Sequence, residues 1–199
     1  MSCPQCFSGH INPGTPTGHW DTVHGLRTYI AEPPAGKSPT GIIVIIPDAF
    51  GVDFVNNQIL ADHYASAADY LVYLPDFMDV ETKTVGGHAL ADAFFTAHPS
   101  NMDVVQDIGN VRGNLTIAIG DDDGVMGMKQ VRQAESILAS KDVDTSVVIY
   151  PGAKHGFSIR ASREKPDSKE TRQAEEAEEQ AIAWFKRRFD IAKQKAVGP

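Results

Sequence analysis

The chain has 199 residues, of which 42% are hydrophobic and 22% are charged, and this balance is typical of a globular protein with a full hydrophobic core. Its formal net charge of -8 and its sequence pI of about 5.3 argue against general binding to nucleic acid or to anionic membranes, because both need clustered Lys and Arg. We therefore expect small neutral or anionic molecules as partners, and the sequence gives no indication of oligomeric state.

No segment of the sequence has the character of a membrane anchor. The longest aliphatic run, Ile42 to Ile46, is far shorter than the roughly 20 residues that cross a bilayer. The polar start Met1-Ser2-Cys3-Pro4 lacks the apolar core of a signal peptide. We expect a soluble cytoplasmic protein with a single domain over residues 1–199, in which residues 1–18 form an N-terminal arm.

The two cysteines, Cys3 and Cys6, are spaced C-x-x-C. A redox pair is conceivable, and so is half a zinc site completed by His10 or His19. A thioredoxin-like motif should begin a helix, whereas Pro4 and the Gly/Pro-rich stretch that follows predict an extended arm. A structural or incidental role is therefore the favoured interpretation.

The first half of the chain predicts two hairpin strands, a buried strand, a helix and a further strand. Segments 20–23 and 26–31 flank His24-Gly25, where Gly tolerates the positive φ of a two-residue turn. The β-branched run Gly41 to Pro47 predicts a strand that is buried on both faces of a parallel sheet. A helix over 56–68 and a strand over 70–74 follow.

The second half of the chain continues to alternate between strands and helices. We expect strands over 93–96, 115–119 and 146–150 and helices over 128–140 and 168–193. This order predicts an α/β fold with a mostly parallel sheet flanked by helices and preceded by an antiparallel hairpin.

In such sheets the catalytic groups lie in loops that follow the carboxyl ends of strands. The first such loop is Pro47 to Gly51, in which the backbone N–H of Ala49 could donate to an oxyanion. An ordinary turn from strand to helix is the alternative interpretation.

The second loop contains three acids, Asp121, Asp122 and Asp123. A calcium loop of the EF-hand type is excluded, because the sixth and twelfth positions counted from Asp121 are Met126 and Arg132 rather than Gly and Glu. Orienting a histidine needs one carboxylate at a rigid strand end, and Asp123 fits this role. A solvated acidic turn is the alternative.

The third loop contains His155, which lies just past the strand over 146–150 and is followed by Gly156. In α/β hydrolases the chain order is nucleophile, acid, histidine, and His155 follows Asp123 by about 30 residues. An exposed loop histidine is the alternative, but the two signals together favour a catalytic pair.

The chain resembles the dienelactone hydrolases, in particular their fungal members, over nearly its whole length. The resemblance rests on short motifs in a fixed order: Ser2-Cys3-Pro4-Gln5-Cys6, Gly14-Thr15-Pro16-Thr17-Gly18, Pro47 to Gly51, Asn57 to Asp62, Tyr73 to Phe77, Thr96 to Ser100, Gly120 to Asp123, and His155-Gly156-Phe157.

This resemblance implies an α/β-hydrolase fold and hydrolysis of a small lactone or carboxylic ester by a Cys-His-Asp triad, without metal or cofactor. Carried over by position, Asp123 orients His155, His155 is the base, and Ala49 gives an oxyanion N–H. Asp48 stands where the family often has an acid near the nucleophile. Arg160 is a candidate for binding a substrate carboxylate.

The sequence departs from the family at the nucleophile. The family places its cysteine in a G-x-C-x-G-G turn, and neither this motif nor G-x-S-x-G occurs here. We expect roughly 50 residues between Phe77 and Ala93 to be absent, including the central nucleophile strand and its helix. If Val85-Gly86-Gly87 is a remnant of the motif, Thr84 stands in the nucleophile's place.

Two consequences are expected from this departure. Turnover of lactones and esters should be very low, since covalent catalysis needs an activated nucleophile. The neighbours of a lost central strand must pair directly or leave N–H and C=O groups unsatisfied, which favours instability or aggregation. The alternatives to an enzyme are a catalytically inactive binding or decoy protein and a truncated splice product.

Overall fold

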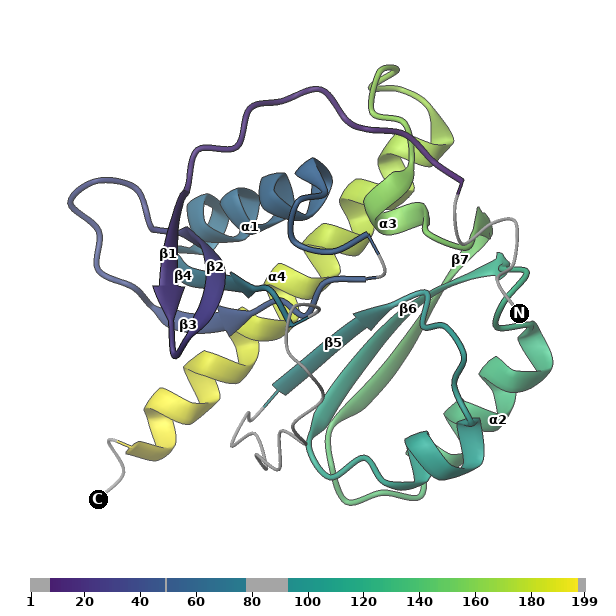
Figure 1. Ribbon diagram of the computed structural model, residues 1–199. Helices are drawn as coiled ribbons and strands as arrows, with labels where there is room; N and C mark the ends of the chain where they lie inside the picture. Colours follow the sequence, from purple (N-terminus) through teal and green to yellow (C-terminus); the bar gives the residue numbers. More distant parts are fainter. Residues whose placement is uncertain (1–7, 49, 78–92, 197–199) are drawn as a thin grey trace. The chain divides into compact units, whose positions relative to one another are not determined.

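The computed structural model describes residues 8–48, 50–77 and 93–196 (Figure 1). The chain divides into two compact units, residues 11–89 and residues 1–10 with 90–199, and each is described by itself. The single domain expected from the sequence stays a prediction. Within the described ranges, no helix is both long enough and apolar enough to cross a membrane.

The unit of residues 11–89 contains a mixed sheet and one helix. The strands are β1 (His19–Val23), β2 (Leu26–Ala31), β3 (Gly41–Val44) and β4 (Tyr70–Pro75), in the order β1-β2-β4-β3, and the helix is α1 (Val55–Ala68). β1 and β2 form the expected antiparallel hairpin, and both turn residues, His24 and Gly25, have positive φ. β4 is the central strand of this sheet, antiparallel to β2 and parallel to β3.

Strand β3 differs from the expectation of a strand buried on both faces. Among the described residues its only neighbour is β4, so it is an edge strand. Ile43 is buried, whereas Ile42 and Val44 are 58% and 53% exposed. The prediction of a strand buried on both faces was therefore wrong. Burial depends on what covers each face of the strand and not only on its aliphatic sequence.

The unit that contains residues 90–199 is built on a three-stranded parallel sheet, in the order β5-β6-β7. Its strands are β5 (Ala93–Ala97), β6 (Asn114–Asp122) and β7 (Thr145–Lys154). Its long helices are α2 (Met128–Leu138) and α4 (Lys169–Ala196), and the sequence predicted both. Two short helices were not predicted, the π-helix η2 (Val104–Ile108) and α3 (Phe157–Arg160).

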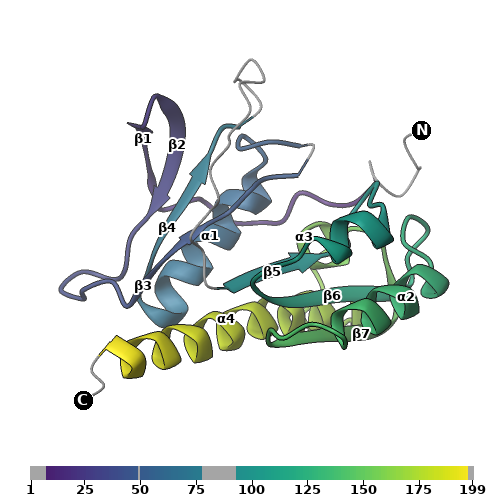
Figure 2. The ribbon, with the colours of Figure 1, turned by 90° about the horizontal axis from the view of Figure 1, so that it is seen from below.

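Helices cover both faces of this parallel sheet (Figure 2). On one face, side chains of β6 pack with η2 and α2; this cluster includes Val104, Ile108, Leu115, Ile117, Ile119, Val131, Ala134 and Leu138. On the other face, Ala118 packs with Tyr150, Phe157 and Ala177 of α4. The parallel sheet with flanking helices and the mixed sheet with its N-terminal hairpin confirm the predicted α/β class.

Strands β6 and β7 extend further than the sequence predicted. β7 continues past Tyr150, the last residue of the predicted strand, through Pro151 and Gly152. Proline is tolerated there because β7 is an edge strand within the described residues. The extension carries β7 to Lys154, directly before His155.

Candidate active site

Three polar side chains follow the three strands of the parallel sheet. Ser100 lies three residues after β5, Asp123 directly after β6, and His155 directly after β7. Since the strands are parallel neighbours, their carboxyl ends meet at one edge of the sheet. The fold therefore brings together residues that are 55 positions apart in the chain.

Asp123 and His155 form a buried hydrogen-bonded pair. His155 Nδ1 lies 3.0 Å from Asp123 Oδ2 and 3.1 Å from Oδ1. The side chains are only 3% exposed for His155 and 0% exposed for Asp123. This contact supports the pairing that the sequence predicted, and it fixes the orientation of the imidazole.

The carboxylate of Asp123 is held in place by its own loop. Its Oδ1 accepts hydrogen bonds from the backbone N–H groups of Val125, at 2.7 Å, and Met126, at 3.0 Å. Burial raises the pKa of Asp123, but the hydrogen bond from His155 and the two backbone N–H donors outweigh burial and hold the pKa below its ordinary value. Asp123 is therefore ionised at neutral pH, and it is buried, whereas Asp121 and Asp122 of the same acidic run are exposed.

The hydroxyl of Ser100 completes a chain of hydrogen bonds. Ser100 Oγ lies 3.0 Å from His155 Nε2. An ionised Asp123 can only accept, so Nδ1 of a neutral His155 carries the proton and Nε2 is the acceptor for the Ser100 hydroxyl. Ser100 is exposed, whereas His155 is buried. The hydroxyl thus stands at the solvent side of the pair.

The turn that carries Ser100 has an unusual backbone. His98 has φ 38° and Asn101 has φ 52°, so two non-glycine residues in the left-handed region flank Ser100. The turn ends at Asp103, whose side chain accepts from the backbone N–H of Gln106 and caps η2. Such backbone strain, at a tight turn between a strand and a helix, clusters at functional sites.

A second histidine, His98, lies beside the pair. Its ring meets the ring of His155 edge to face at 5.1 Å, and its Nε2 is 2.8 Å from Ser158 Oγ. Burial, with the nearby His155 and Arg160 adding to the effect, lowers the pKa of His98 to about 3. His98 is therefore neutral under ordinary conditions, so it adds no charge beside the Asp123–His155 pair.

Arg160 lies in the same unit as His155, where its hydrogen bonds hold a neighbouring segment of the chain. Its buried side chain donates from Nε to the carbonyl of Ser8 at 3.1 Å, and its own carbonyl accepts from the N–H of His10 at 2.9 Å. Arg160 thus holds the segment 8–10 in place. The expected binding of a substrate carboxylate by Arg160 stays a prediction.

The other residues singled out from the sequence belong to the other unit or lie outside the described residues. Asp48 belongs to the unit of residues 11–89, where its carboxylate accepts from the N–H of Phe50 at 3.1 Å. Ala49, Thr84 and the two cysteines lie outside the described residues. Within the described ranges, no group of three metal-binding side chains occurs.

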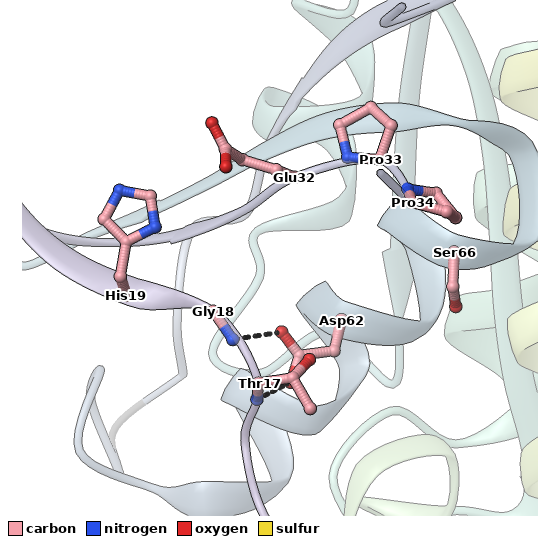
Figure 3. Close-up of a pocket in the computed structure, with 8 residues that line it drawn as sticks. All are labelled: Thr17, Gly18, His19, Glu32, Pro33, Pro34, Asp62 and Ser66. Atoms are coloured by element: carbon pink, nitrogen blue, oxygen red, sulfur yellow. Dashed lines mark hydrogen bonds between the residues drawn. The ribbon is translucent and has the colours of Figure 1, made fainter. Parts of the chain in front are cut away.

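Two motifs of the family resemblance meet in the unit of residues 11–89. Asp62 accepts hydrogen bonds from the N–H of Thr17 at 2.6 Å and of Gly18 at 3.2 Å (Figure 3). It also accepts from the hydroxyl of Tyr29 at 2.8 Å. Asp62, Thr17 and Gly18 border a pocket of about 320 Å³. Through these hydrogen bonds the Asp62 carboxylate anchors the N-terminal arm at Thr17 and Gly18.

A sheet of this kind, with an acid and a histidine at the carboxyl ends of neighbouring parallel strands, defines an α/β hydrolase. The solved structure of Thermogutta terrifontis esterase 2 phosphorylated by paraoxon has the same fold, with a TM-score of 0.62 over 85% of this chain and 93% of the esterase. The two sequences are 12% identical, so this likeness concerns the fold.

The particular family follows from the sequence comparison. The model of the dienelactone hydrolase family matches residues 82–189, more than half of the chain. The chain therefore belongs to the dienelactone hydrolase family, and by this homology it is a hydrolase.

Two fungal relatives match most of the chain. Hydrolase pyvD from Aspergillus violaceofuscus is 23% identical over 90% of this chain and 94% of its own length. Hydrolase tropI from Talaromyces stipitatus is 23% identical over 93% of this chain and 95% of its own length. The tropI alignment runs over 248 positions, so at least 49 of them have no counterpart among the 199 residues of this chain.

Sequence reasoning missed Ser100 and His98 as site residues. The signal was present, because Ser100 follows a predicted strand and precedes Asp123 and His155 in the order nucleophile, acid, histidine. The turn that carries Ser100 has no flanking glycine, so the G-x-C-x-G-G and G-x-S-x-G patterns do not mark it.

Proposed function

We propose that this chain hydrolyses small carboxylic esters or lactones, with His155 as general base and Asp123 as the group that orients it. The observation that carries the proposal is the buried contact of 3.0 Å between His155 Nδ1 and Asp123 Oδ2. A carboxylate in this place fixes the tautomer of the imidazole and stabilises the imidazolium that forms when the base takes a proton. Family membership supports the same reaction class.

Two further features support a base rather than a structural histidine. His155 Nε2 faces a hydroxyl at 3.0 Å, within the range for proton transfer. The neighbouring His98 stays neutral, so it adds no positive charge that would oppose protonation of His155. General base catalysis of this kind contributes typically 10² to 10⁴ in rate.

We propose a modest absolute rate. The sequence has no G-x-C-x-G-G motif, so the thiolate of the family, a strong nucleophile, is not available at an elbow. The oxyanion donor proposed at Ala49 lies outside the described residues. His155 and Asp123 supply the general base and the carboxylate that orients it, which are one part of the catalytic machinery, and we therefore propose a modest rate.

The test is a panel of p-nitrophenyl esters of short acids and small lactones, assayed with the full chain, His155→Ala and a matched control. His63→Ala removes a histidine from helix α1 of the other unit and serves as that control. Turnover that His155→Ala loses and His63→Ala keeps supports the proposal. No turnover by the wild-type chain, or equal turnover by all three proteins, contradicts it.

A second candidate function, ligand binding without turnover, is favoured by the positions that tropI has and this chain lacks. A loss of this size fits the proposal that the elbow segment between Phe77 and Ala93 is absent, as in a truncated splice product. Thermal unfolding with a non-hydrolysable lactam distinguishes the two functions. A raised Tm in a chain without turnover supports the binding protein.

A further inference from the structure

We infer that Ser100 is the nucleophile of this chain and replaces the missing cysteine from a different strand end. The inference rests on the proposed ester hydrolysis and adds to it the residue that attacks the substrate. Four observations carry it.

The first observation is the geometry of the hydrogen-bond chain. Ser100 Oγ is 3.0 Å from His155 Nε2, and His155 Nδ1 is 3.0 Å from Asp123 Oδ2. A nucleophile, its base and the group that orients the base need contacts of this length. The order along the chain is Ser100, Asp123, His155, which is the order of the triad in α/β hydrolases.

The second observation is the difference in solvent exposure between Ser100 and the other two side chains. His155 and Asp123 are buried, whereas Ser100 is exposed. The hydroxyl of Ser100 occupies the acceptor side of His155 Nε2, so a water molecule can reach this nitrogen only by displacing it. The first group on which the base acts is therefore the serine hydroxyl.

The third observation is the local fold. Ser100 sits between strand β5 and helix η2, on a turn whose neighbours His98 and Asn101 have φ 38° and 52°. A nucleophile elbow is a tight, strained turn between a strand and a helix that projects the nucleophile from the strand end. The turn here holds Ser100 in an equivalent way without glycines.

The fourth observation is the anchoring of this turn. The N–H of His98 donates to the carbonyl of Ala118 on β6 at 2.9 Å, and the side chain of His98 bonds Ser158 at 2.8 Å. Asp103 caps η2 at the other end of the turn. The position of Ser100 is thus fixed from both sides, which a nucleophile requires.

The reaction follows in two balanced steps. Ser100 Oγ attacks the carbonyl carbon while its proton passes to His155 Nε2; the ester C–O bond then breaks, and the leaving alcohol takes that proton. Water attacks the acyl group on Ser100, His155 takes a proton from the water, and the C–Oγ bond breaks as Ser100 regains the proton. The products are one carboxylic acid and one alcohol or, from a lactone, one hydroxy acid.

The experiment treats the full chain with paraoxon and locates the adduct by intact mass and peptide mapping. Paraoxon is chosen because its phosphorus reacts with an activated serine hydroxyl and does not depend on ester turnover. We expect one diethyl phosphoryl group on Ser100, none on Ser100→Ala, and labelling slowed by roughly 10² or more in His155→Ala.

The matched control is Ser140→Ala, because the exposed hydroxyl of Ser140 donates to the carbonyl of Ile137 at 2.7 Å rather than to a histidine. It should be labelled like the wild-type chain. Near-unchanged thermal unfolding of Ser100→Ala, as expected for an exposed position, shows that loss of labelling is not loss of folding.

The outcomes separate this inference from the proposed function. If Ser100→Ala keeps ester turnover that His155→Ala loses, water is the nucleophile, the inference about Ser100 is wrong and the proposed function stands. If Ser100 is labelled but no ester or lactone is turned over, the inference holds and the proposed function fails. Labelling of another residue, or none, overturns the inference.

Discussion

The guanidinium of Arg160 lies against Gly156, in the space that a Cβ at position 156 would occupy. Gly156 also has φ 86°, a conformation that residues with a side chain rarely adopt. Because Gly156 directly follows His155, we expect a side chain at position 156 to shift the imidazole. The close approach of Arg160 and the positive φ explain why the His-Gly-Phe motif has glycine at position 156.

Gly156→Ala should therefore be destabilising and should displace His155. We expect a loss of about 1 to 3 kcal/mol from backbone strain, together with lower ester turnover. Urea unfolding measures the loss. Gly109→Ala is the control, since Gly109 has nothing within 4 Å of its ideal Cβ and its φ is negative. Equal stability of the two variants would contradict this account.

Asp123→Asn should lower kcat by roughly 10⁴, the magnitude known for the orienting acid of a triad. An amide NH₂ facing Nδ1 forces the proton of His155 onto Nε2, where it can no longer accept from Ser100. Asp122→Asn in the same acidic run is the control, because Asp122 is exposed. Similar kcat values for the two variants would show that Asp123 does not act through His155.

His98 makes the stability of the chain depend on pH. Its pKa is lowered from 6.5 to about 3 by burial, with His155 and Arg160 adding to the effect. Between these values the unfolded chain binds a proton that the folded chain does not, so stability is retained above pH 6.5 and falls as pH drops toward 3. Across this pH range the free energy of unfolding falls by at most about 1.4 kcal/mol per pH unit.

The measurement is urea unfolding of the wild-type chain and His98→Asn at several pH values between 7 and 4. Asn removes the titrating ring and tolerates the positive φ at this position. The variant should show a shallower fall in stability with acid. Parallel curves for the two proteins would exclude His98 as the cause.

Edge strand β3 should promote association of the chain. Among the described residues it is an edge strand that exposes Ile42 and Val44, and Ile46 just beyond it is exposed too; an aliphatic edge strand is a template for pairing between chains. Ile42→Lys should reduce concentration-dependent light scattering while stability stays within about 0.5 kcal/mol. Ile43→Lys at the neighbouring buried position should cost about 3 kcal/mol or more. Unchanged scattering by Ile42→Lys would refute this role of the edge.

The sequence was informative where chemistry and local pattern agree. Asp123 and His155 directly follow β6 and β7, and the rule that catalytic loops follow parallel strands, together with the chain order acid then histidine, was enough to predict their pairing. The hairpin was predictable from His24-Gly25, because the turn geometry depends only on those two residues.

The sequence was uninformative where the answer depends on distant neighbours. The burial of Ile42 and Val44 depends on what lies beside β3, which the run Gly41 to Pro47 does not encode. The role of Ser100 depends on His155, 55 positions away, and no local motif marks it. Arg160 could not be assigned because its partner, the carbonyl of Ser8, carries no sequence signal.

The most direct test of the central claim, that His155 is the base of an ester hydrolase, is kcat/KM for p-nitrophenyl acetate in the wild-type chain and His155→Ala under identical conditions. We predict measurable turnover by the wild-type chain and a loss of roughly 10² to 10⁴ in the variant. Equal values in the two proteins, or no turnover by a folded wild-type chain, would contradict it.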